Sequence, residues 1–200
     1  MKGLACLVLA GCALTRGPRP PLEIRTFTPE MPAHGVHTER PVTTLRLRLG
    51  RLSSAEDLRL HILHRVSPIE VTPYETLQWT EEPEAYVRRA LARALFDERP
   101  IEEVVSGAAP TLEVEVTGFE EITYRHAGRV ALRYELQNDR TTIARGTISI
   151  ERRATRPNIE GIVEAIGAAL DAATEELAER VEVALRGPPA SEDESVEAQR

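Results

Sequence analysis

Residues 61–91 carry the clearest structural pattern in the chain: HILHRVSPIEVTPYETLQWTEEPEAYVRRAL. Apolar residues recur at even positions as far as Val66, and the pair Ser67-Pro68 is typical of a turn. A second extended segment follows, up to Tyr74. This pattern predicts a β-hairpin.

The same stretch continues into an amphipathic helix. Glu81 and Glu82 suit the positive end of a helix dipole, and Pro83 is tolerated in a first turn. Apolar residues then recur at helical spacing, at Tyr86, Val87, Ala90, Leu91, Ala94 and Leu95. The helix is expected to end near Asp97.

Further strands flank this hairpin and helix. Alternating apolar residues predict strands at 45–49, 112–116, 130–136 and 144–150, and residues 22–27 can form a first strand. The strand of the hairpin's first arm is expected to begin at the Leu58–Leu60 alternation. These segments give three or four strands before the first helix and three strands after it.

The second half closes with a long helix. Gly118-Phe119 is expected to mark a bulge in the first of its strands, and Asn158 or Pro157 to open the helix. The helix carries one apolar stripe, formed by Ile159, Ile162, Ile166, Leu170, Ala173, Leu177 and Val181.

The order βββ-α-βββ-α predicts a single α+β domain over residues 22–186. Two amphipathic helices each need a sheet face to cover, so we expect a mainly antiparallel sheet of about six strands with both helices on one face. Residues 187–200 are acidic and without periodicity, which predicts a disordered tail.

Composition excludes several classes of function. Two hundred residues with 42% hydrophobic content suffice for one core, and the formal charge of −7 argues against a nucleic-acid partner. Beyond residue 12, no apolar run approaches the roughly 18 residues of a spanning helix. The only lysine is Lys2, so a chain beginning at Cys12 has no P-loop or Schiff-base lysine.

The N-terminus carries the one motif with definite chemistry. A positive start at Lys2 precedes a short apolar run that ends in Leu9-Ala10-Gly11-Cys12, which resembles the lipobox of bacterial lipoproteins. The resemblance implies a signal peptide over residues 1–11, acyl chains such as palmitate on Cys12, and a tether over residues 12–21.

Two further residues bear on this anchor. Ala13 stands where an inner-membrane retention aspartate would be, which favours the outer membrane. Cys6 would be removed with the signal, so we expect no disulfide or free thiol in the mature chain.

The histidines do not predict a metal site. His61 and His64 fall on opposite faces of a strand, and His64 is expected to be a partly buried core or interface residue. His34 and His37 lie in a loop near Glu39, where no third ligand is fixed.

Catalytic residues are not predicted either. The helix start explains Glu81, Glu82 and Glu84, and Ser67 and Ser106 stand outside any G-x-S-x-G pattern. We expect no enzyme and no cofactor. A secreted hydrolase stays open as an alternative, because triads are not readable from spacing.

Three residues are candidates for partner contact. Trp79 either anchors the core between hairpin and helix or is an exposed contact. Arg46 and Arg48, with Arg59, form a basic stripe on the polar side of the strands, which either meets a carboxylate-rich partner or lipid phosphates, or is an ordinary solvated face.

The quoted run 61–75, Leu77-Gln78-Trp79 and residues 83–91 together resemble the ABC-type transport auxiliary lipoprotein family, which includes the PqiC-like proteins. His64 departs from the aromatic residue expected in that strand. The resemblance implies a non-catalytic lipoprotein on the periplasmic side of the envelope. Its implied partners are an MCE-domain protein with its permease and ATPase.

Other assemblies stay open. One is an outer-membrane assembly lipoprotein that binds a barrel partner, similar in layout to the lipopolysaccharide-assembly plug. A homo-oligomer is also compatible with the sequence.

Overall fold

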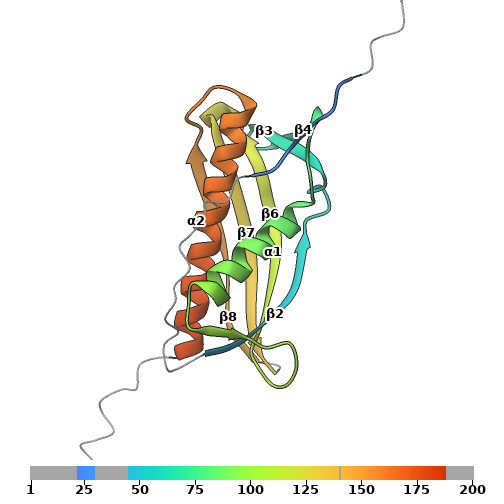
Figure 1. Cartoon of the computed structure of the whole chain (residues 1–200). Helices are drawn as coiled ribbons and strands as arrows, with labels where there is room; N and C mark the ends of the chain where they lie inside the picture. Colours follow the sequence, from blue (N-terminus) through green and yellow to red (C-terminus); the bar gives the residue numbers. More distant parts are fainter. Residues whose placement is uncertain (1–21, 30–44, 140, 188–200) are drawn as a thin grey trace, which may run out of the picture.

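The computed structural model describes residues 22–29, 45–139 and 141–187 (Figure 1). Its strands are β1 (Arg25–Phe27), β2 (Leu45–Ser54), β3 (His61–Ser67), β4 (Glu70–Trp79), β5 (Ile101–Glu103), β6 (Thr111–Ile122), β7 (Ala127–Asn138) and β8 (Thr141–Arg153). The helical segments are α1 (Pro83–Ala92), the π-helical turn η1 (Arg93–Asp97), the 3₁₀ turn η2 (Thr123–Arg125) and α2 (Ile159–Arg186).

Strand β6 organises the sheet. One edge of β6 pairs antiparallel with β7 along its length, and β7 pairs in turn with β8. The other edge is shared: β2 pairs with residues 111–116 and β3 with residues 120–122, both parallel to β6. Beyond them, β5 joins β2, and β4 and then β1 extend the sheet from β3.

The expectation of a mainly antiparallel, six-stranded sheet is wrong. The sheet has eight strands and is mixed, and four of its seven strand pairings are parallel, namely β1–β4, β2–β5, β2–β6 and β3–β6. Strand β5, which was not predicted, has three residues, too few to show an alternation.

The parallel pairings of β2 and β3 with β6 arise because these two strands follow one another along a single edge of β6. The short segment between them does not reverse the chain, and the backbone N–H of Ala55 still donates to the carbonyl oxygen of Val116 at 2.9 Å. Leu58, Arg59 and Leu60 lie in this connection, so the expected start of the strand at Leu58 is also wrong.

Several local expectations are confirmed. β3 and β4 form the hairpin, and the pairing of β6 with β7 shifts register between Val116 and Gly118. The first helix with its π-helical turn ends at Asp97. The side chain of Asn158 caps α2 by accepting from the backbone N–H of Gly161 at 3.1 Å.

Both helices lie on one face of the sheet (Figure 1). α2 runs along β7 and β8, while α1 crosses β2 and β6 and meets α2. A Cβ atom on Gly128 of β7 would lie 2.4 Å from the backbone nitrogen of Ile166, so the helix touches the strand backbone there. Arg93 also joins the helices through an ion pair with Asp171 at 2.5 Å. The apolar stripes of both helices are buried in this interface.

Candidate binding surface

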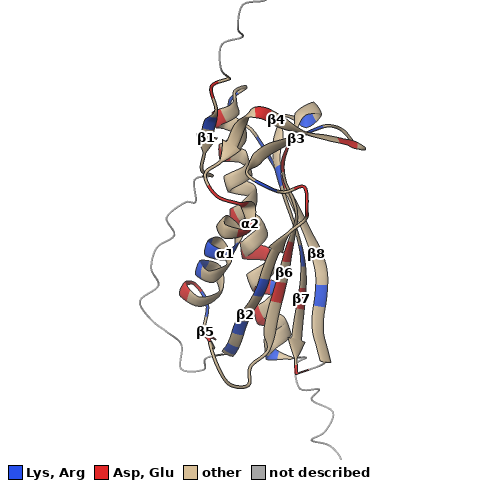
Figure 2. Cartoon of the chain, turned by 90° about the vertical axis from the view of Figure 1, so that its right-hand side faces the viewer, with Lys and Arg blue, Asp and Glu red and all other residues tan. Residues whose placement is uncertain are grey.

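Within the described parts of the chain, no helix lies over the opposite face of β6, β7 and β8 (Figure 2). Charged and polar residues make up most of its lining. A shallow hollow of about 720 Å³ lies on it. We call the following lining residues the helix-free face: Arg51, Ser53, Glu113, Glu115, Arg133, Glu135, Arg145 and Thr147. Strand alternation explains the set, because apolar neighbours such as Leu132 and Ile148 point to the helices.

Polar contacts on the helix-free face are exposed and weak. Arg133 pairs with Glu115 across the strands at 2.9 Å, and the Thr142 hydroxyl donates to Glu135 at 2.7 Å. Exposed pairs of this kind stabilise a fold by about 0–1 kcal/mol. They can exchange partners at little cost, which suits a polar, reversible contact with another protein.

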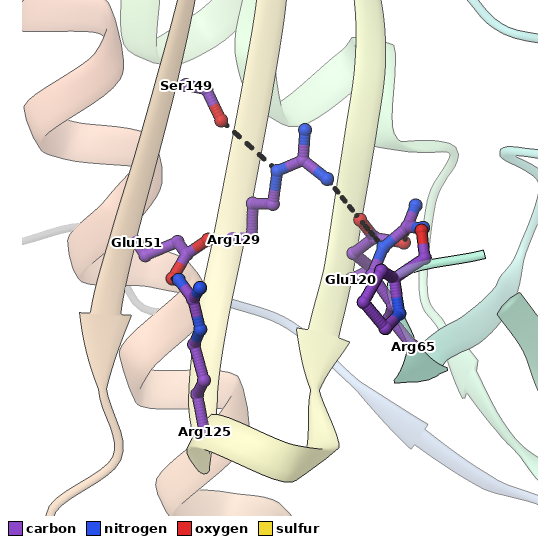
Figure 3. A network of polar contacts seen from close by, with 7 residues as sticks. Arg65, Glu120, Arg125, Arg129, Ser149 and Glu151 are labelled. Carbon is purple, nitrogen blue, oxygen red and sulfur yellow. Dashed lines mark hydrogen bonds and ion pairs between the residues drawn. The ribbon is translucent and has the colours of Figure 1, made fainter. Parts of the chain in front are cut away.

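A stronger network lies further along the same side of the sheet (Figure 3). Glu120 is buried, and its carboxylate accepts two hydrogen bonds from Arg65, at 3.0 and 3.2 Å, and one from Arg129 at 2.9 Å. Arg129 also donates to the Ser149 hydroxyl at 3.1 Å. The network therefore ties β3, β6, β7 and β8 together.

The bulge before Gly118 makes this arrangement possible. Before it, Glu113 and Glu115 face away from the helices; after it, the even-numbered Glu120 does so. A Cβ atom on Gly118 would lie 3.1 Å from the Cβ of Ala131, so small residues meet at the point where the strand shifts.

Glu121 consequently points to the helix-covered side and is also buried. The hydroxyl of Tyr74 donates to its carboxylate at 2.5 Å. His64 stacks on the Tyr74 ring at 4.2 Å and lies 3.0 Å from the Thr72 hydroxyl. Burial, together with the hydrogen bond to Glu121, raises the pKa of Tyr74 above its ordinary value. The cluster holds a neutral tyrosine against the Glu121 side chain, and its contacts join β3, β4 and β6.

Trp79 lies in the core. It is 1% exposed, and its ring lies edge-on to Phe119 at 5.2 Å and to Tyr86 at 6.2 Å. This placement agrees with the anchor interpretation. A role in partner contact would require Trp79 to leave this cluster.

The arginine stripe is divided by the structure. Arg46 is exposed, while Arg48 is half-buried and donates to the carbonyl oxygen of Gly107. Arg59 lies outside the strands, 3.8 Å from Glu82. Arg46 and Arg48 remain candidates for partner contact, and Arg59 does not extend their stripe along a strand.

The remaining candidates stand apart from one another. His61 bonds the carbonyl oxygen of Tyr74 at 3.1 Å. Glu81 pairs with Arg89 at 2.5 Å on the surface of α1. Across the described parts of the chain, no three His, Cys, Asp or Glu side chains gather to hold a metal ion. Within the same ranges, no helix combines the length and the apolar character needed to cross a membrane.

Some predicted features lie outside the described residues. These are the signal peptide 1–11, the lipidation site Cys12 with the tether 12–21, the loop candidates His34, His37 and Glu39, and the tail beyond Gly187.

Two features were not predicted from the sequence: the Arg65–Glu120–Arg129 network and the Tyr74–Glu121 pair. A signal was present, because two consecutive glutamates stand between Phe119 and Ile122 at the end of a strand. Adjacent strand residues point to opposite faces, so one of the two had to enter the helix-covered side.

Comparison with known proteins gives a family and a fold. The profile of the ABC-type transport auxiliary lipoprotein component family matches residues 26–178, which confirms the resemblance drawn from the sequence. A crystal structure of a protein from Xanthomonas campestris is similar with a TM-score of 0.70 at 20% identity, over 81% of this chain and 97% of that one.

Two other solved structures share the fold. An uncharacterized protein matches with a TM-score of 0.64 at 14% identity, over 80% of this chain and 99% of that one. A hypothetical protein from Chlamydia trachomatis matches with a TM-score of 0.51 at 10% identity, over 72% of this chain and 98% of that one. A comparison with curated proteins found no match.

Proposed function

The chain belongs to the family of ABC-type transport auxiliary lipoprotein components, and from this membership we propose that it is a non-catalytic subunit of an envelope transport system. In this proposal, acyl chains on Cys12 hold it at the periplasmic side of a membrane, more specifically the outer membrane. Its partner is an MCE-domain protein that works with a permease and an ATPase on lipids or other hydrophobic solutes.

The match over residues 26–178 carries this proposal. The helix-free face supports it with a broad polar surface, where arginines and glutamates alternate around a shallow hollow. A polar rim with exchangeable ion pairs is typical of non-obligate protein contacts. We therefore propose that the helix-free face is the docking face, with Arg46 and Arg48, which share strand β2 with Arg51 and Ser53, as candidate contributors.

Site-specific crosslinking in cells tests the partner and the face together. A photo-crosslinking residue at Thr147 on the helix-free face should join the chain to an MCE-domain subunit. The matched position is Glu179, which is exposed on α2 and should give no such product. Crosslinks from Thr147 to a barrel protein would favour the outer-membrane assembly alternative, and crosslinks from Glu179 alone would refute the proposed face.

A separate experiment tests the anchor. Cys12→Ser should abolish incorporation of radiolabelled fatty acid and release the domain from the membrane without changing its thermal unfolding. Absence of label on the unaltered chain would rule out lipidation at Cys12.

A further inference from the structure

Apolar side chains are exposed at one end of the sheet. Ile69, in the turn between β3 and β4, is 97% exposed, and Val66 precedes it at the end of β3. Tyr124 of η2 is 50% exposed. β3 reaches the end of β6, where Arg65 pairs with Ile122, so the turn and η2 lie next to each other. We call Val66, Ile69 and Tyr124 the apolar tip.

The described chain enters the domain from this same end. β1 pairs in parallel with the last residues of β4, and the segment before β1 rises at the end of the molecule where the β3–β4 hairpin also lies (Figure 2). Leu22 and Ile24 in that segment are exposed. Cys12 stands ten positions before Leu22, and ten residues span at most roughly 35 Å. An anchor at Cys12 therefore holds Leu22 within about 35 Å of the bilayer, at the end of the molecule that carries the tip.

Basic side chains surround the tip. The guanidinium of Arg125 lies 5.6 Å from the centre of the Tyr124 ring and pairs with Glu151 at 2.8 Å. Arg152 and Arg153 are exposed at the end of β8, beside the first residues of β7. Arginines can meet lipid phosphates, and tyrosine is enriched where membrane meets water. Opposing charges at this end are Glu151, the exposed Glu23, and Glu70, which is exposed next to Ile69.

We propose that the apolar tip inserts into the bilayer that holds the acyl chains. Ile69 enters the acyl region, Tyr124 lies at the headgroup level, and Arg125, Arg152 and Arg153 contact phosphates. The inference builds on the lipid anchor of the proposed function, which brings the tip within reach, and adds a second membrane contact that fixes how the domain stands. The helix-free face then extends away from the lipid, along the long axis of β6, β7 and β8.

Tryptophan fluorescence tests this on the full-length, lipidated protein. Ile69→Trp is reconstituted in phosphatidylethanolamine–phosphatidylglycerol vesicles whose acyl chains carry bromine. The buried Trp79 gives the same background signal in every variant. The added tryptophan should lose most of its emission to the bromolipid and shift to the blue.

Val105→Trp is the matched control. Val105 is 88% exposed in the connection between β5 and β6, at the other end of the sheet from the tip. Its emission should be unaffected by the bromolipid. Equal quenching of the two variants, or no quenching of Ile69→Trp, overturns the proposal. If the tip contacts a protein instead of lipid, Ile69→Trp is not quenched.

Two measurements keep the outcome clear. Tyr124→Trp, read in the same vesicles, replaces Ile69→Trp if near-ultraviolet circular dichroism shows that the turn variant is misfolded. Mass spectrometry of the same sample reports the acyl chains on Cys12. Acylated protein with an unquenched tip refutes this inference and leaves the proposed function intact, whereas an unacylated Cys12 refutes the anchor and the quenching result still decides the tip.

Discussion

The two faces of one sheet are held by different physics. The helix-covered face is apolar, and its rings and aliphatic side chains are almost completely buried against α1 and α2. The helix-free face carries exposed ion pairs such as Arg133–Glu115. Burial dominates stability, and exposed ion pairs add little to it. The helix-covered face therefore maintains the fold, whereas residues of the helix-free face are available to contact a partner.

The largest effect should come from the helix-covered face. Phe119 is fully buried between Trp79 and Tyr86. Phe119→Ala should lower the free energy of unfolding by about 3–5 kcal/mol through lost burial and a cavity, as measured by urea denaturation. Thr147→Ala on the helix-free face is the control and should change it by less than about 0.5 kcal/mol. Similar losses of unfolding free energy in Phe119→Ala and Thr147→Ala would contradict the difference in stability contribution between the two faces.

A smaller effect is expected where the helix-free side has a buried charge. Glu120→Ala leaves the guanidinium groups of Arg65 and Arg129 facing each other without their carboxylate. Both arginines are partly exposed, so we expect a loss of about 2–3 kcal/mol, below the roughly 3–5 kcal/mol for a fully buried pair. Glu115→Ala removes an exposed partner and should cost less than about 1 kcal/mol. Thermal or urea unfolding of the two variants compares them directly; a smaller loss for Glu120→Ala would contradict the role of burial.

Tyr74→Phe should have a smaller effect still. It removes the hydroxyl that donates to the buried Glu121 but keeps the ring that stacks on His64. The expected loss is about 1–2 kcal/mol in urea unfolding at neutral pH. Tyr124→Phe is the matched control, because Tyr124 is exposed. No difference between the two would show that Glu121 finds another donor.

The same tyrosine predicts a pH dependence. The pKa of Tyr74 is raised in the folded chain, so its contribution is complete below the ordinary tyrosine pKa of about 10 and is lost as the pH rises above it. The unaltered chain should therefore lose stability above pH 10 more steeply than Tyr74→Phe. Unfolding curves taken on both sides of pH 10 measure this difference, and parallel curves would contradict it.

What the sequence predicted follows from the range of the interactions involved. The hairpin, the end of the first helix at Asp97 and the cap at Asn158 depend on neighbours in the chain, and periodicity and turn residues reveal them. The partners of β6 depend on which segments meet in space. Nothing in residues 45–67 alone indicates that β2 and β3 lie in line beside a strand from the other half.

The candidate surface shows the same limit. The arginines of β2 were visible as a polar stripe in the sequence. The charged residues of β7 and β8 that line the same face are far from them in sequence, so the stripe alone did not reveal this surface. The Arg65–Glu120 pair joins residues 55 positions apart, and only the bulge at Gly118 turns Glu120 towards Arg65. Family membership was recognisable because it depends on the order of local packing motifs.

The sharing of β6 by β2 and β3 also constrains how the molecule folds. During synthesis, β2, β3 and β4 are made before β6, the strand with which β2 and β3 both pair. The pairings of β2 and β3 with β6 join residues roughly sixty positions apart. Contacts of such sequence separation slow folding, because a long loop must close before they form. Before residues 111–122 are available, β3 can pair with β4 and β2 with β5, but the edges of β2 and β3 that pair with β6 have no partner. Unpaired strand edges favour aggregation, so we expect the nascent chain to depend most on chaperones in this interval.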